Sequence, residues 1–307
     1  MKAALLQDFV HQVRERGLEV HGVAVQQHGR LLEEYRWVED LPHILHSLSK
    51  SFTATAVGMA VEEGRFRLDD RVVDFFPEEA PREVSLYLEE LTVRDLLIMA
   101  PGRAGSLMLQ KQRDTIPNPN WVEYYLGEPL TCRPGTYFAY DTGCTYMLSA
   151  LIQKTTGVKL VDYLQPRLFI PFGYEENPRW EECPRGIDLG GAGLWLRTTQ
   201  LLPLAQLYLQ QGQWEDRQIL TQEWVREATS KQIDTAVTQT SRDNVCGYGY
   251  QFWICHNGAY RGDGAYAQFC IVLPWLDAVI AVNSQERRAQ EVLDVIWATI
   301  LPKLEEG

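Results

Sequence analysis

The sequence has 307 residues, enough for one large domain or about two ordinary ones, and a chain of this length can bury a core without a disulfide framework. Lys and Arg number 29 against 41 Asp and Glu, and the resulting net charge of −12 argues against a nucleic acid as the main ligand. A hydrophobic fraction of 45% excludes a largely disordered chain.

The chain contains no segment that predicts export or membrane insertion. The apolar run Ala3–Leu6 is too short for the core of a signal peptide. The longest stretches without a charged residue, Thr198–Trp214 and Asn244–Tyr260, are interrupted by Gln, Asn and other polar residues. We therefore expect a cytoplasmic protein with no membrane partner. Its six cysteines form no C-x-x-C or zinc-type cluster and are expected to be free thiols.

The first third of the chain alternates between helical and strand patterns. Helical spacing runs through Ala3–Val13, and two strand-like segments, Val20–Val25 and Leu31–Trp37, follow with a polar turn between them, which indicates a hairpin. A long apolar helix is then predicted from about His46 to Glu63. Its apolar residues recur at three- and four-residue steps, so we expect it to be largely buried.

The rest of the chain predicts a helical middle and a strand-rich end. Four helical segments lie between Leu68 and Ile187, where strand patterns are sparse. Strands are expected at Tyr248–Cys255, Tyr266–Leu273 and Ala278–Val282, before a final helix Glu286–Leu304. This order predicts an α+β fold: an antiparallel sheet domain built from residues 1–67 and 188–307, and a mostly helical domain, residues 68–187, inserted into it.

The buried helix begins with the pattern Ser47-Leu-Ser-Lys50. Spacing of i, i+3 places Ser47 and Lys50 on one helix face, within reach of each other. A lysine whose pKa is lowered by burial can take the proton of a serine hydroxyl and make it a nucleophile. The N–H of Ser47 at the helix start can also stabilise an oxyanion. The alternative is that Ser47 merely caps the helix.

Several segments in order resemble one family. His46–Gly64 with Leu68-Asp-Asp, then Leu91–Leu97, then Gly190–Thr199 look like successive motifs of the β-lactamase-related serine hydrolases, which include class C β-lactamases, D-Ala-D-Ala carboxypeptidases, esterases and amidohydrolases. The resemblance extends from about residue 20 to about residue 285. It implies the fold of the β-lactamases and penicillin-binding-protein transpeptidases, an acyl-enzyme mechanism, and no metal or organic cofactor.

The resemblance also implies the remaining site residues. Tyr140 falls at the catalytic tyrosine of the family's Y-x-N motif, and Thr142 replaces its Asn. We expect Tyr140 to act as a partial phenolate or a proton relay, and Thr142 to contact substrate. The third motif aligns with Gly262-Asp263-Gly264, which we expect to lie along the substrate.

The N–H of Ala265 would then be the second oxyanion donor. The family's basic residue is missing from the third motif, and Arg261 beside it is predicted to grip a substrate carboxylate. The alternative is a hairpin turn in which Arg261 and Asp263 are exposed or pair with each other.

Other candidates are weaker. His43 and His46 would share a helix face, but no carboxylate completes a metal set, and capping or pocket lining is the simpler interpretation. Four aromatic residues are expected either to line a cleft or to pack in the core: Trp121, Tyr124, Tyr125 and Trp253.

The sequence therefore predicts a serine hydrolase for a small ester or amide. One alternative is a D-Ala-D-Ala carboxypeptidase, D-aminopeptidase or β-lactamase. The other is a catalytically silent member that binds a ligand or assembles into oligomers. The oligomeric state is left open.

Overall fold

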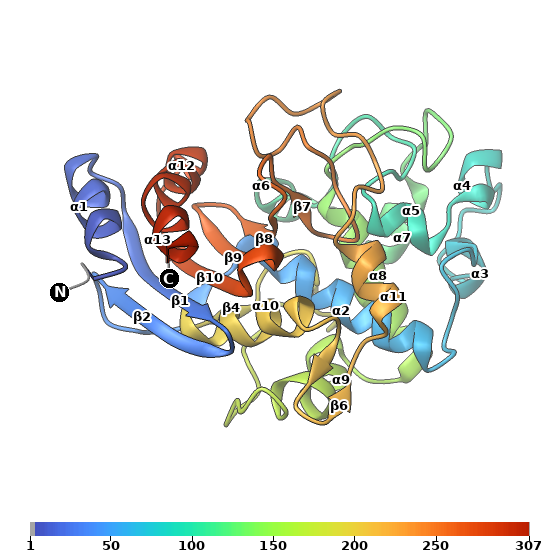
Figure 1. The fold of residues 1–307 in the computed structure, drawn as a ribbon. Coiled ribbons are helices and arrows are strands. Elements are labelled where there is room, and N and C mark those ends of the chain that lie inside the picture. Colours follow the sequence, from blue (N-terminus) through green and yellow to red (C-terminus); the bar gives the residue numbers. More distant parts are fainter. Residues whose placement is uncertain (1–3, 307) are drawn as a thin grey trace.

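A six-stranded antiparallel sheet stands at one end of the computed structural model, which describes residues 4–306 (Figure 1). The strand order is β2-β1-β10-β9-β8-β7, so the N-terminal hairpin pairs with the last strand of the chain. The strands are β1 (Val20–Gln27), β2 (Arg30–Arg36), β7 (Trp253–Ile254), β8 (Tyr260–Gly264), β9 (Gln268–Leu273) and β10 (Ala278–Ser284).

Helices cover both faces of the sheet. The central strands carry buried apolar side chains on both faces, and both faces must therefore be covered. On one face lie α1 (Gln7–Glu15), α12 (Ala289–Thr299) and α13 (Leu301–Glu305), which share one apolar cluster with the sheet. On the other lie α2 (Ser49–Glu62) and α10 (Leu202–Leu209), within a second and larger cluster.

The larger cluster continues into the helical part of the chain (Figure 1). These elements are α3 (Val72–Phe75), α4 (Leu86–Glu90), α5 (Val93–Leu97), α6 (Gln110–Arg113), α7 (Trp121–Gly127), α8 (Thr142–Thr156), α9 (Leu160–Leu164) and α11 (Gln222–Ala228). Short strand pairs join β3 (His43–Ile44) to β4 (Trp195–Leu196), and β5 (Gln213–Trp214) to β6 (Arg217–Gln218). The predicted α+β class with an antiparallel sheet is confirmed.

Three predicted elements differ from the structure. Of the expected strand Tyr248–Cys255, only the two residues of β7 form a regular strand, because only Trp253 and Ile254 pair with β8. The final helix is divided at Ile300, since Pro302 has no N–H to continue the α12 ladder and opens α13 instead. The predicted strand Tyr266–Leu273 begins only at Gln268, after a turn at Ala265–Ala267, and the Arg-Gly-Asp-Gly segment lies in strand β8, so the exposed-turn alternative for it is wrong.

The start of the predicted first helix, Ala3, lies outside the described residues, and α1 begins at Gln7. Within residues 4–306, no helix combines the length and apolar character needed to cross a bilayer.

Strand β8 packs against the start of α2 with glycine at the points of contact. A Cβ on Gly264 would lie 2.1 Å from the carbonyl oxygen of Leu45 and 3.1 Å from the backbone nitrogen of Leu48. A Cβ on Gly262 would lie 2.3 Å from Cδ1 of Leu48. Glycine therefore sets the separation between this strand and the turn that carries Ser47.

Gly264→Ala should destabilise the protein by about 2 kcal/mol or more, because the obstructing atoms are backbone and cannot rotate away. Urea unfolding followed by circular dichroism measures this change. Gly127→Ala is the matched control, since nothing lies within 4 Å of a Cβ there. Equal free energies of unfolding for the two variants would contradict the close packing.

Candidate active site

Ser47 lies on a single 3-10 turn, His46–Leu48, which runs directly into α2. The side chain of Ser49 stabilises this turn. Its hydroxyl donates to the carbonyl of His46 at 2.7 Å and accepts from the N–H of Leu194 at 3.2 Å. Ser47 is half-buried, whereas the helix behind it is buried as far as Ala60. The only serine of the Ser-x-Ser-Lys pattern that reaches solvent is thus the predicted nucleophile.

The amine of Lys50 is directed at Ser47. Its Nζ lies 3.1 Å from the Ser47 Oγ, 2.6 Å from the carbonyl oxygen of Gly191 and 3.3 Å from the Thr142 Oγ1. The side chain is only 1% exposed. Three partners from three separate segments therefore fix one nitrogen beside the serine hydroxyl, and the predicted Ser–Lys proximity is present in the structure.

Burial lowers the pKa of Lys50 to about 7, although the charge of Asp141 opposes this change. At neutral pH about half of the amines are then neutral. A neutral amine can accept the Ser47 proton along the 3.1 Å hydrogen bond, and the ammonium that results can give a proton back. Lys50 thus has the position and the basicity of a general base.

Tyr140 closes the other side of Ser47. Its ring stacks on Trp253, with 5.6 Å between centroids, and the Lys50 Nζ lies 5.1 Å from its ring centroid. Burial raises the pKa of Tyr140, and a hydrogen bond with Ser47 only partly opposes this. The phenol therefore stays protonated at neutral pH. The raised pKa of Tyr140 disfavours the predicted phenolate, and the proton relay stays a prediction.

Asp141 is a buried carboxylate beside the site that the sequence analysis did not single out. It caps α8 by accepting from the N–H of Gly143 at 2.9 Å, and it accepts from the N–H of Leu107 at 2.8 Å. Burial raises its pKa to about 6, opposed mainly by Arg103. The signal available in the sequence was an Asp directly before a helix. Thr142, next in the chain, is buried and directs its hydroxyl at Lys50.

Ala265 follows β8 and is exposed at the start of a turn in which Tyr266 and Ala267 adopt left-handed backbone angles. The contacts of Gly264 with Leu45 and Leu48 bring this end of β8 beside the Ser47 turn. Gly262 and Gly264 are packed against protein atoms on the face where a side chain would stand. The role of the Ala265 N–H as an oxyanion donor stays a prediction.

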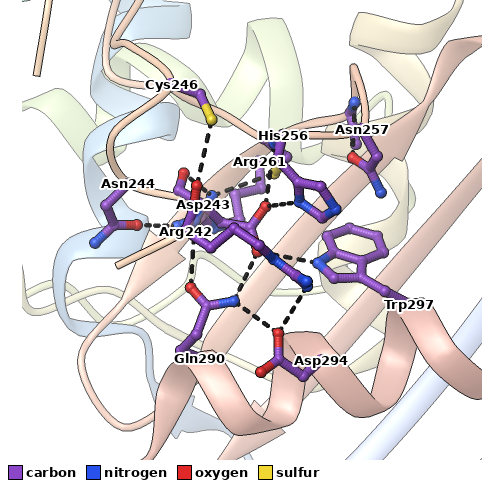
Figure 2. Close-up of polar contacts among 12 residues, drawn as sticks. Arg242, Asp243, Asn244, Cys246, His256, Asn257, Arg261, Gln290, Asp294 and Trp297 are labelled. Atoms are coloured by element: carbon purple, nitrogen blue, oxygen red, sulfur yellow. Dashed lines mark hydrogen bonds and ion pairs between the residues drawn. The ribbon is translucent and has the colours of Figure 1, made fainter. Parts of the chain in front are cut away.

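Arg261 is buried, and polar side chains surround its guanidinium (Figure 2). Its guanidinium donates to Asp263 at 2.8 Å, to the Asp243 carbonyl at 3.2 Å and to the Cys255 sulfur at 3.2 Å, and it also bonds Asn244. Because only 1% of the residue is exposed, its guanidinium presents no accessible pair of N–H groups to a substrate. The prediction that Arg261 grips a substrate carboxylate therefore conflicts with the structure, and its pairing with Asp263 is the alternative that the structure supports.

The predicted aromatic residues divide between site and core. Trp253 stacks on Tyr140, whereas Tyr125 is buried against Asp141. Trp121 packs on Tyr146 with 5.8 Å between ring centroids and belongs to the larger core cluster. Tyr124 is half-buried at the edge of the same cluster.

The two candidate histidines do not share a helix face. His43 lies in β3, with its Nδ1 3.4 Å from the Nδ1 of His21, and His46 packs its ring on Tyr266. The helix assumed for His43 begins only after it, at the 3-10 turn. Among residues 4–306, no three His, Cys, Asp or Glu side chains are grouped so that they could hold a metal ion.

The position of Lys50 predicts how activity depends on pH. Because only the neutral amine accepts the Ser47 proton, kcat/KM should rise with pH through a midpoint near 7, the value to which burial lowers the pKa of Lys50. Initial rates of p-nitrophenyl butyrate hydrolysis, corrected for spontaneous hydrolysis, give this profile.

Asp141→Asn should move the midpoint to lower pH, since the carboxylate charge raises the pKa of Lys50 and the amide keeps the helix cap. A midpoint in the ordinary lysine range, or one that moves upward in Asp141→Asn, would contradict the assignment of Lys50 as the base.

Comparison with known proteins identifies the family of this chain. The family model described as Beta-lactamase matches residues 3–301. "Penicillin-binding protein 4" of Amycolatopsis lactamdurans is 30% identical over 131 residues, which are 43% of this chain and 34% of that protein. The "6-aminohexanoate-dimer hydrolase" of Paenarthrobacter ureafaciens is 22% identical over 81% of this chain and 68% of its own length. The chain thus matches about a third of the first relative and about two thirds of the second.

Solved structures show the same fold. A putative 6-aminohexanoate-dimer hydrolase from Bacillus anthracis has a TM-score of 0.79 at 20% identity, covering 97% of this chain and 81% of that one. An octameric penicillin-binding protein homologue from Pyrococcus abyssi has a TM-score of 0.78 at 18% identity, covering 97% of this chain and 77% of that one. At these identities the likeness concerns the fold.

Proposed function

This chain belongs to the beta-lactamase family, and on that premise we propose that it is a serine hydrolase that forms an acyl-enzyme at Ser47 from a small ester or amide. The observation that carries the proposal is the 3.1 Å contact between the Lys50 amine and the Ser47 hydroxyl, together with a lysine pKa of about 7. A buried amine with that basicity beside a half-exposed serine is suited to nucleophilic catalysis.

In acylation, the Ser47 oxygen forms a bond to the substrate carbonyl carbon while its proton passes to Lys50. The carbonyl oxygen becomes an oxyanion, for which we assign the N–H groups of Ser47 and Ala265. When the bond to the leaving alcohol or amine breaks, that group takes a proton from Lys50 through Tyr140. The charge on Lys50 is thereby returned to its starting value.

In deacylation, a water molecule attacks the acyl carbon and the Ser47 oxygen leaves. We assign the water's proton to Lys50, directly or through Tyr140, and the same proton then returns to Ser47. This assignment follows from the pKa values: burial raises that of Tyr140, so the phenol can pass a proton on but is a poor primary base.

Several relatives support a hydrolase of small carbonyl compounds without fixing the substrate. Besides the dimer hydrolase, they include the "Lovastatin esterase" of Penicillium rubens, 25% identical over 48% of this chain and 42% of its own length. Peptidase or β-lactamase activity is the other enzymatic proposal, and a silent binding protein is the remaining one. The burial of Arg261 argues against carboxypeptidase or β-lactamase activity, because D-Ala-D-Ala peptides and β-lactams carry a carboxylate that Arg261 cannot reach.

Replacement of the nucleophile tests the proposal. A fluorophosphonate probe should add its mass to Ser47, and Ser47→Ala should abolish labelling and lower p-nitrophenyl butyrate turnover by at least about a thousandfold. Intact-protein mass spectrometry and steady-state rates provide the two measurements.

Ser85→Ala is the control, since Ser85 is an exposed helix cap far along the chain, and it should label like the wild type. Full turnover by Ser47→Ala would rule out the mechanism. A properly folded wild type that neither labels nor hydrolyses any ester would favour the binding protein.

A further inference from the structure

Asp263 is a mostly buried carboxylate on strand β8, which packs against the turn of Ser47. One of its oxygens accepts from the Arg261 Nε at 2.8 Å, and no hydrogen bond to its other oxygen is found among residues 4–306. Its side chain is 20% exposed, whereas that of Arg261 is 1% exposed. The carboxylate is therefore the more accessible member of this ion pair, and the guanidinium is covered by protein.

The network behind Arg261 holds this orientation (Figure 2). Arg261 is anchored to Asn244, Cys255 and the carbonyl of Asp243. The carboxylate of Asp243 is fully buried. It accepts hydrogen bonds from the side chains of His256 at 2.6 Å, Gln290 at 2.7 Å and Trp297 at 3.1 Å. These contacts keep the guanidinium from swinging out toward a ligand.

Asp263 also lies close to the reacting groups. The guanidinium carbon of its ion-pair partner Arg261 lies 5.9 Å from the ring centroid of Trp253, and Trp253 stacks on Tyr140. Asp263 precedes Ala265 by two residues. The pKa of Tyr140 is raised by burial, and the charge of Asp263 adds to that rise, as expected of a carboxylate within electrostatic reach of the phenol.

The edge of β8 at Asp263 is not paired with another strand among residues 4–306. Strand β7 pairs with β8 at Tyr260 and Arg261 and then ends, so within the described residues no strand covers Gly262–Gly264 on that side. A leaving group that takes its proton through Tyr140 must lie on this side of Ser47, and it would then lie along the uncovered edge beside Asp263.

We infer that Asp263 makes the site selective for substrates whose leaving group carries a positive charge, such as esters of quaternary or primary amino alcohols, and unfavourable to leaving groups that carry a carboxylate. This inference rests on the proposed function and names its substrate class. No new chemical step is involved: the charged alcohol leaves with the proton that Tyr140 passes to it, as any alcohol would.

Three butyrate esters of nearly equal shape test the inference. Butyrylcholine carries a quaternary ammonium, 3,3-dimethylbutyl butyrate replaces that nitrogen by carbon, and 3-carboxypropyl butyrate carries a carboxylate. Rates are measured by titration of the released acid at low ionic strength. The wild type should favour the cationic ester over the neutral one by about tenfold in kcat/KM and disfavour the anionic one, and salt should reduce both differences.

Asp263→Asn should reduce the ratio of kcat/KM for the cationic ester to kcat/KM for the neutral ester from about tenfold to about one, and Asp263→Glu should retain part of that ratio. Asp216→Asn removes the same charge from an exposed turn and should retain the full preference. Thermal unfolding and the neutral-ester rate together show whether a variant has lost structure rather than selectivity.

Equal kcat/KM for the cationic and neutral esters in the wild type, or an equal loss for both in Asp263→Asn, would overturn the inference and leave the proposed function standing. If none of the three esters is hydrolysed and Ser47 does not label, the proposed function fails, and the inference fails with it.

Discussion

The burial of one ammonium group is the constraint on which the rest of this structure depends. Lys50 lies in the first turn of a helix that is buried through Ala60, and water cannot solvate its amine. The protein must supply the lost hydrogen bonds, and it does so with Ser47, Thr142 and the carbonyl of Gly191. Those partners come from three separate segments. The hydrogen bonds that the Lys50 amine needs therefore bring the three segments of the site together.

This arrangement costs stability. In the unfolded chain Lys50 has an ordinary pKa of 10.5, and burial lowers it to about 7 in the folded protein. Between these values the unfolded state binds more protons, so the cost is full below pH 7 and fades as pH rises toward 10.5. The same change in pKa supplies a base that works at neutral pH. Stability is thus given up for reactivity at the residue that the mechanism requires.

Local patterns in the sequence were sufficient for the parts of the site that depend on neighbours along the chain. Ser47 and Lys50 are three residues apart on one turn, and the antiparallel strands at both ends follow their apolar patterns. Long-range partners could not be predicted in this way. The contact of Lys50 with Gly191 spans 141 residues, and nothing near Gly191 marks its carbonyl as a ligand.

At Arg261 the local pattern favours a different structure from the one that the fold adopts. A stretch with the sequence Arg-Gly-Asp-Gly is typical of an exposed turn, because glycine and charged residues are common there. Here the glycines are needed for the close approach of β8 to α2, and the charges are paired within a network that closes only in the fold.

The missing basic residue of the third motif follows from this packing. The space in which a side chain at position 262 would lie is already filled: a Cβ there would be 2.3 Å from Cδ1 of Leu48 and 2.7 Å from the Ser51 hydroxyl. A lysine or histidine at this position would require the side chains of Leu48 and Ser51 to move. Lys50 is consequently the cation in direct contact with Ser47. Arg261 is buried and Asp263 is partly exposed, so the more accessible charge beside position 262, where the family resemblance implies a basic residue, is a carboxylate.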